Sequence, residues 1–365
     1  MPTQRTSNSA PHAGSTLVGM LFVLATLFCW SVTPVFVEFF TDKVDPWTSN
    51  GWRYGFAALL WLPLLLVTAA LRRLPKGLFR RAIVPGLVNA CGQIVFVLAF
   101  YNTTAPMVAI GLRTQIIVVS LGAALFFAAE RRIVTRPGYI VAIVMIVGGL
   151  VAAVLLGGET AFDEVDGFIL ALAAGAGYGL YALSVRHWMH GVNPLLAFAA
   201  ISQYTAAIMR SLMFLLAEDF GAGALALSPK VFSLFLLSAV IGIAIGHVVY
   251  YIAISRLGVA VASGVVQTQP VWVALISWAF LDQPGLSAKQ WIGGAVAIVG
   301  AIVLLWVQHT TRRTTAETIE QQSPPNAHRC SECGFDLGQD IEGTCPEYGQ
   351  VFPRADEAIQ SSSKG

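Results

Sequence analysis

Charge is scarce in this 365-residue sequence: 12% of the residues are Asp, Glu, Lys or Arg, whereas 56% are hydrophobic. A soluble domain carries about 25% charged residues, so roughly half of the usual charge is present. The net charge of +2 is too small to predict binding to nucleic acid. The composition therefore indicates a polytopic membrane protein.

Catalytic motifs are also lacking. The sequence contains no H-E-x-x-H, no G-x-S-x-G and no pair of carboxylates within an apolar run, which argues against an intramembrane enzyme. A cleavable signal peptide is not expected either. The first apolar run, 15–40, is too long for a signal core and lacks a clean cleavage site of small residues. We interpret it as the first transmembrane span.

Long apolar runs predict ten transmembrane helices, since each run is close to the ~20 residues that cross a bilayer. The predicted spans are 16–40, 47–71, 82–102, 106–129, 138–156, 167–187, 194–216, 231–255, 259–281 and 290–307.

Lys and Arg are concentrated in alternate loops. The second loop and the fourth loop together hold Arg72, Arg73, Lys76, Arg80, Arg81, Arg131, Arg132 and Arg136. Because positive loops stay in the cytoplasm, both termini are predicted to be cytoplasmic, which agrees with an even number of spans.

The chain is duplicated. Its hairpin 103–156 aligns with 257–306, and matching polar positions continue along both halves. The aligned pairs include Trp30 with Tyr178, Arg53 with Gln203, Gln93 with His247, Arg113 with Gln267, Thr114 with Thr268 and Gln115 with Gln269. Halves of five spans must be inverted in the membrane, because five is odd. Repeated inverted halves are typical of secondary transporters.

Three segments carry a resemblance to a known family: LFCWSVTPVFVEF, WRYGFAALLWLP and QPVWVALISWAFLDQ followed by QWIGGAVAIVGAIVLL. Over residues 16–307 the chain resembles the EamA-type members of the drug/metabolite transporter superfamily. The resemblance implies an all-α membrane protein of ten transmembrane helices, built as two inverted five-helix repeats around a central cavity. Ile116 stands where the second hairpin has Pro270. The sequence therefore does not decide whether the fourth span contains a helix break.

The expected organisation has six parts. They are a cytoplasmic N-terminal segment (1–15), the first repeat (16–157), the second repeat (158–307), a disordered linker (308–327), a zinc-ribbon-like cytoplasmic module (328–353) and a disordered tail (354–365).

Two arginines lie within predicted spans that contain no central carboxylate. A charged side chain at this depth costs at least about 2.5–3.5 kcal/mol and is normally retained for a pathway or a partner. A guanidinium group binds carboxylate or phosphate bidentately, so we predict that Arg113, assisted by Arg53, holds an anionic or zwitterionic substrate. Alternatively, Arg53 extends to the headgroups, as we expect for Arg210.

Other polar and aromatic residues within the spans are candidates for lining the cavity. His247 is either a proton carrier or a structural histidine. Trp30 and Tyr178 are either cavity walls or ordinary packing residues. Four glutamines are costly in lipid and are expected to face the interior, where they contact substrate or neighbouring helices: Gln93, Gln115, Gln267 and Gln269.

The five cysteines fall into two groups. Cys29 and Cys91 lie in apolar runs and are expected to be inert. Cys330 and Cys333, with Cys345, resemble the two knuckles of a zinc ribbon, but Tyr348 stands at the position of the fourth cysteine. Either His328 completes a three-Cys, one-His structural zinc site, or the site has decayed and binds no metal.

The leading functional prediction is a secondary transporter of the inner or plasma membrane. It would export or exchange small organic metabolites, such as amino acids or other anionic or zwitterionic solutes, by alternating access. Its expected partners are a small-molecule substrate and the lipid bilayer, with no cofactor for transport, no nucleic acid and an undetermined oligomeric state. The alternative is a membrane-anchored sensor or scaffold that acts through the metal-binding tail.

Overall fold

The computed structural model describes residues 13–126, 134–155, 165–257, 262, 265–281 and 286–321. Within these ranges the chain is helical and contains no strand. Eight helical segments are long and apolar enough to cross a membrane. Two shorter apolar helices, Pro137–Ala153 and Gln269–Phe280, occupy the places of predicted spans five and nine. Together these segments account for the ten spans that the apolar runs predict.

The elements follow the predicted duplication. The first half contains α1 (Ala13–Phe39), α2 (Pro46–Ala70), α3 (Leu78–Ala99), α4 (Ala105–Gly111), α5 (Thr114–Phe126) and α7 (Pro137–Leu155). The second half contains α9 (Val165–Trp188), α10 (Pro194–Leu216), the 3₁₀ turn η2 (Ala222–Ala226), α11 (Pro229–Ala239), the π-helix η3 (Val240–Ile245), α12 (Gly246–Leu257), α14 (Gln269–Phe280) and α15 (Ala288–Gln321).

Three of the helices begin in the same way, with a polar capping residue followed by proline. The side chains of Asp45, Asn193 and Ser228 accept hydrogen bonds from backbone N–H groups in the first turns of α2, α10 and α11. Such a cap satisfies donors that the helix itself leaves unpaired, and proline in the first turn has no N–H to satisfy. The chain thus carries local signals that fix where these spans begin.

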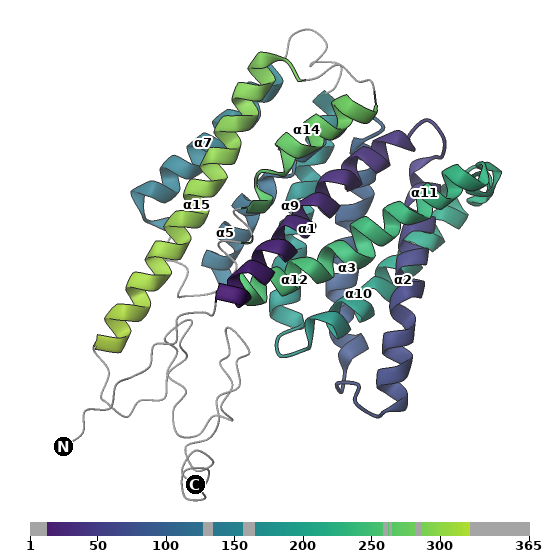
Figure 1. Ribbon diagram of the computed structural model, residues 1–365, viewed down its shortest axis with the longest axis horizontal. Coiled ribbons are helices and arrows are strands. Elements are labelled where there is room, and N and C mark those ends of the chain that lie inside the picture. Colours follow the sequence, from purple (N-terminus) through teal and green to yellow (C-terminus); the bar gives the residue numbers. More distant parts are fainter. Residues whose placement is uncertain are drawn as a thin grey trace, which may run out of the picture.

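The halves pack against each other in a symmetric pattern. Helix α2 packs on α10, and α7 on α15, which run side by side along one edge of the bundle (Figure 1). Helix α3 packs on α9, just as its repeat equivalent α12 packs on α1. Exchanging the two halves leaves these pairings unchanged, as inverted repeats require.

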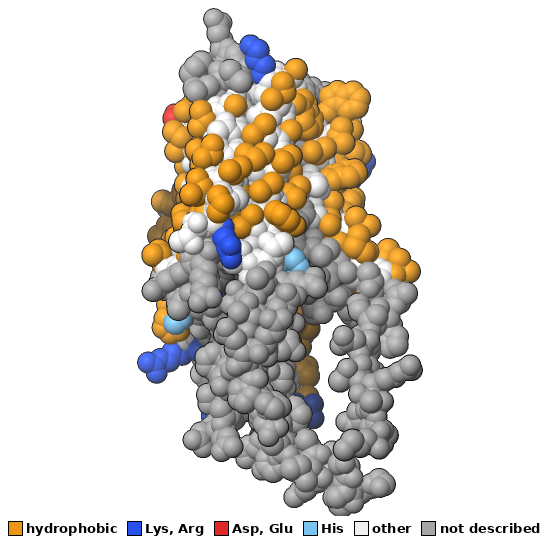
Figure 2. All heavy atoms as spheres, turned by 90° about the vertical axis from the view of Figure 1, so that its left-hand side faces the viewer, with side chains coloured by type: hydrophobic (Ala, Val, Ile, Leu, Met, Phe, Trp, Pro, Cys, Tyr) orange, Lys and Arg blue, Asp and Glu red, His pale blue; other side chains and the backbone are white. Residues whose placement is uncertain are grey.

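The α7–α15 pair is in close contact because glycines lie at the crossing. A Cβ atom at Gly149 would lie 2.5 Å from the backbone nitrogen of Ala297, and one at Gly293 would lie 2.4 Å from that of Ala153. The outward faces of both helices carry exposed apolar side chains, including Val144 and Trp306. Figure 2 shows hydrophobic side chains over this side of the molecule, as contact with lipid tails requires.

Helix α15 extends further than the apolar run predicts. We expected a span ending at 307 and a disordered linker over 308–327, but α15 continues to Gln321. No proline or glycine follows Gly300 until Pro324. An established helix adds residues at little cost, so it continues through the polar sequence after the span.

Replacing Gly149 by alanine should separate α7 from α15. The added methyl group overlaps the backbone of α15, and overpacking of this kind costs about 1–3 kcal/mol. We expect Gly149→Ala to lower the thermal midpoint in detergent. Gly148→Ala is the matched control, because nothing lies within 4 Å of a Cβ atom there. Equal midpoints for the two variants would contradict the close contact at this crossing.

Candidate functional site

Spans four and nine break at equivalent positions. Helix α4 ends at Gly111 and α5 begins at Thr114, while α14 begins at Gln269 after a turn at 267–268. The hydroxyl group of Thr114 donates to the carbonyl of Gly111 at 3.0 Å, and the hydroxyl group of Thr268 donates to that of Val265 at 2.7 Å. At both breaks, therefore, a threonine hydroxyl group donates to the carbonyl three residues earlier in the chain.

The break in span four forms without the proline found in span nine. Ile116 occupies the position equivalent to Pro270, so the sequence alone did not decide whether span four is broken. The turn packs on Gly175 of α9, where a Cβ atom would lie 3.0 Å from the carbonyl oxygen of Leu112. The helix is therefore interrupted where its turn approaches Gly175 closely and where Thr114 bonds a carbonyl three residues earlier.

Arg113 lies between the two breaks and is 5% exposed. Its Nη1 donates to the side-chain oxygen of Gln267, and its Nη2 to that of Gln269, both at 2.9 Å. Nη1 also donates to the carbonyl of Val266 at 3.4 Å, and Nε donates to the carbonyl of Ala109 at 3.2 Å. Three of these four acceptors belong to the second half of the chain.

The acceptors around Arg113 are all neutral. The carbonyls of Ala109 and Val266 belong to the last turns that precede the two breaks, where unpaired carbonyls carry partial negative charge. In the described part of the chain, the salt bridge is Lys43–Asp42, and Arg113 bonds no carboxylate. The hydrogen bonds of this guanidinium group are thus made to neutral oxygens, and no carboxylate among the described residues offsets its formal charge.

An aromatic cluster adjoins the arginine through Gln269. The side-chain nitrogen of Gln269 donates to the carbonyl of Trp30 at 2.5 Å. The Trp30 ring meets His247 edge-on at 5.6 Å between centroids, and Phe198 stacks on His247 at 4.7 Å. Nδ1 of His247 lies 3.1 Å from the carbonyl of Ile243, so this nitrogen is assigned the proton and Nε2 remains an acceptor. Trp30, His247, Gln269 and Arg113 therefore form one connected group.

The repeat equivalents of Trp30 and His247 are Tyr178 in α9 and Gln93 in α3. A Cβ atom at Gly92 would lie 3.3 Å from the Tyr178 ring, and one at the equivalent Gly246 would lie 2.7 Å from the Trp30 ring. Each half thus places an aromatic residue of its first span on a glycine in the third span of the other half.

Arg53 occupies a different environment. It is 3% exposed, and its Nε donates to the hydroxyl oxygen of Ser238 at 3.0 Å. This burial excludes the alternative in which Arg53 extends to the headgroups, whereas Arg210 is exposed. Among the described residues, Ser238 is not one of the hydrogen-bond partners of Arg113. The two arginines therefore belong to separate hydrogen-bonded groups.

Sequence reasoning missed two contributors to these groups. Ser238 was not among the predicted site residues. Its hydroxyl group, within the apolar run of span eight, indicates a polar contact inside the bundle. Phe198 carried no signal, because one phenylalanine among many does not indicate which ring stacks on a histidine.

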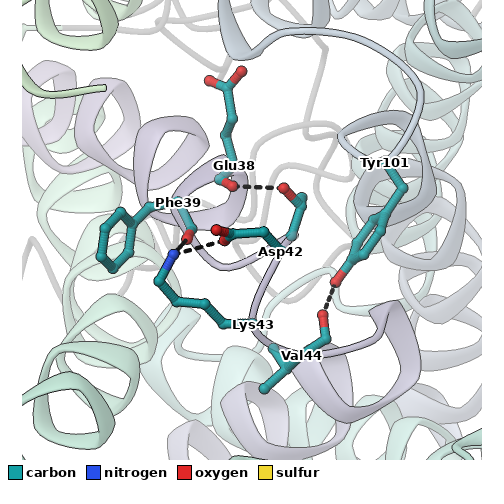
Figure 3. A network of polar contacts seen from close by, with 7 residues as sticks. Glu38, Phe39, Asp42, Lys43, Val44 and Tyr101 are labelled. Carbon is teal, nitrogen blue, oxygen red and sulfur yellow. Dashed lines mark hydrogen bonds and ion pairs between the residues drawn. The ribbon is translucent and has the colours of Figure 1, made fainter. Parts of the chain in front are cut away.

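Polar contacts follow the end of α1, and Figure 3 shows several of them, including the bond between Tyr101 and Val44. The carboxylate of Glu38 accepts a hydrogen bond at 3.1 Å from the backbone nitrogen of Ala105, where α4 begins. The hydroxyl group of Tyr101 donates to the carbonyl of Val44. These contacts hold the entry to α4, the short helix that leads to Arg113.

The predicted metal site lies outside the described residues, which end at 321. Its proposed ligands are His328, Cys330, Cys333 and Cys345. Within the described ranges, no group of three or more His, Cys, Asp or Glu side chains is arranged to hold a metal ion.

The family described as "EamA-like transporter family" matches residues 17–155 and again residues 166–306. The chain belongs to this family. It is therefore a membrane transporter of small solutes, built from two inverted repeats. No curated protein matches the sequence.

A solved structure described only as "Crystal structure of protein" is similar to the chain. It is 18% identical, with a TM-score of 0.55, over 82% of this chain and 98% of its own. At this identity the likeness concerns the fold alone.

Removing the acceptor of Arg53 should destabilise the bundle. Ser238→Ala leaves a buried, charged donor without its partner, which costs about 1–3 kcal/mol. We expect a lower thermal midpoint than for Ser233→Ala, the matched control, because Ser233 lies exposed on the same helix. A midpoint unchanged by Ser238→Ala would contradict the contact.

Proposed function

We propose that this transporter carries anionic or zwitterionic organic solutes, such as amino acids, as an exporter or exchanger. The observation that supports this most is the buried Arg113, which lies between two helix breaks and whose acceptors among the described residues are all neutral. A carboxylate that reached Nη1 and Nη2 would replace two amide oxygens with a full negative charge. Binding of an anion would therefore relieve the uncompensated charge at the centre of the bundle.

The neighbouring aromatic group would receive the rest of the solute. The Trp30 ring adjoins His247, and Gln269 joins the Trp30 backbone to Arg113. Binding sites combine apolar and aromatic surface with a few polar groups that fix orientation. Arg113 would thus orient the carboxylate while the rings contact the apolar part. Arg53, Tyr178, Gln93, Gln115 and Gln267 are proposed as further residues facing the pathway.

Alternating access would proceed by movement of one repeat against the other around this central site. In the described part of the chain, the buried carboxylate is Glu38, which lies at one end of the bundle and bonds Ala105. This supports exchange or facilitated movement over proton coupling through a central carboxylate. The distribution of Lys and Arg supports an inner or plasma membrane protein with both termini in the cytoplasm.

A thermal-shift screen of the purified protein in detergent tests the anion site. The panel contains amino acids, dicarboxylates, sugar phosphates, nucleotide sugars and organic cations. We expect one anionic or zwitterionic class to raise the midpoint in the wild type and to have no effect on Arg113→Gln, because the variant cannot pair with a carboxylate.

Arg210→Gln is the matched control, since it removes the same charge from an exposed position. It should respond to the same compounds as the wild type. Stabilisation of Arg113→Gln by the same anion, or stabilisation of the wild type by cations alone, would refute this site.

A further inference from the structure

A cavity lies between the ends of α9 and α10 that the loop 189–193 joins, and its volume is ≈ 210 Å³. Sites for drug-sized ligands have volumes of about 300–1,000 Å³, so this cavity suits a smaller solute. Apolar side chains form much of its wall: Met189, Ala197, Phe198 and Ile201 are each 4% exposed or less. They belong to the hydrophobic core, so the cavity extends into the bundle.

Two polar side chains, Arg186 and His190, also line the cavity. Nε2 of His190 is buried, and among the described residues it has no hydrogen-bond partner. Because buried polar atoms normally have a partner, one without a partner at a cavity wall indicates a ligand. Arg186 adds positive charge, and the described lining contains no Asp or Glu. A carboxylate would match this lining.

The loop that carries His190 is held by Arg81. Nε of Arg81 donates to the carbonyl of Trp188 at 2.6 Å, and its Nη2 donates to the carbonyl of His190. Gly191 follows with a φ of 71°, which side chains rarely tolerate, and this lets the chain turn toward α10. These contacts fix the backbone of His190, so its place at the cavity is a property of the fold.

Phe198 connects the cavity to the group around Arg113. The Phe198 ring lines the cavity and also stacks on His247 at 4.7 Å between centroids. His247 in turn meets Trp30 edge-on. Gln269 then joins the Trp30 carbonyl to Arg113. A solute in the cavity would therefore be separated from His247 by one aromatic ring.

We propose that this cavity is a second binding site, which a small organic anion occupies on its way to or from Arg113. Arg186 and His190 bind its carboxylate, the apolar wall contacts its carbon chain, and Phe198 closes the inner end. This inference rests on the proposed function, because it assigns the same class of solute to the cavity. The basic loop 71–77 lies at this end, so the site would serve the cytoplasmic side.

Protection of a cysteine in the cavity wall tests the site. The full chain carrying Val192→Cys is treated with N-ethylmaleimide in detergent, and the reaction at position 192 is followed by peptide mass spectrometry. The exposed Cys91 is the internal reference. Hexanoate is the probe, and hexanamide is its neutral match. We expect hexanoate to slow the reaction, and hexanamide to do so only at about ten-fold higher concentration, because it lacks the charge.

Arg186→Gln should raise the half-protecting concentration of hexanoate about ten-fold, because it removes a charged hydrogen-bond partner. Arg73→Gln is the matched control, since Arg73 is exposed, and it should leave this concentration unchanged. Arg113→Gln should leave it unchanged as well. The cavity is therefore tested independently of the anion site proposed above.

Phe198→Ala should lengthen the cavity toward His247. Octanoate should then protect about ten-fold more tightly than hexanoate, the factor expected for two more buried CH₂ groups. The two acids should protect equally when Phe198 is present. Phe235→Ala is the matched control, because Phe235 is equally buried but packs against Phe40 in a different cluster.

Equal protection by hexanoate and hexanamide, or unchanged protection by hexanoate in Arg186→Gln, would overturn the proposal. Loss of protection in Arg113→Gln would overturn it too, because the two sites would then be one. Protection by phosphatidylglycerol in mixed micelles but not by hexanoate would also do so, since the cavity would then bind a lipid headgroup. The comparison of hexanoate with hexanamide needs no further variant, so the proposal is tested even if a variant does not fold.

Discussion

The centre of this bundle depends on the stabilisation of one buried guanidinium group. Removing a cation from water is costly, so the surrounding fold must supply oxygen atoms in the right directions. It does so with the carbonyls of Ala109 and Val266 and the side chains of Gln267 and Gln269. Three of these acceptors come from the half of the chain that does not contain Arg113. Most of the oxygen atoms that stabilise this charge are therefore in place only when the other repeat is packed against it.

Symmetry of the backbone and asymmetry of the side chains have different consequences. The matching helix pairs and the equivalent bonds of Thr114 and Thr268 show that the backbones of the two repeats are alike at these positions. The repeat equivalent of Arg113 is Gln267, and the two side chains bond each other. A contact between equivalent residues lies at the pseudo-twofold axis. Because one member of this pair is charged and the other is neutral, the two repeats are electrostatically unequal at their contact.

The sequence was sufficient for the span count, the duplication and the inversion, because run length and charge placement are local properties. The break in span four could not be predicted from Ile116, since close approach to Gly175 of another span accompanies it. The length of α15 was underestimated because polar residues were taken as the end of the helix. Arg113 was predicted to be important, but its partners were not. Three of the four lie more than 150 residues away in the sequence, and tertiary packing brings them to Arg113.

A double-mutant cycle between Arg113 and Gln269 tests the central claim most directly. The free energy of unfolding in detergent would be measured for Arg113→Met, Gln269→Leu and the double variant, with Gln115→Leu in place of Gln269→Leu as the reference cycle. Hydrogen bonds to charged groups contribute about 1.5–3 kcal/mol, so we predict a coupling energy of this size for Arg113 with Gln269 and none with Gln115. Additive effects of Arg113→Met and Gln269→Leu would contradict the account.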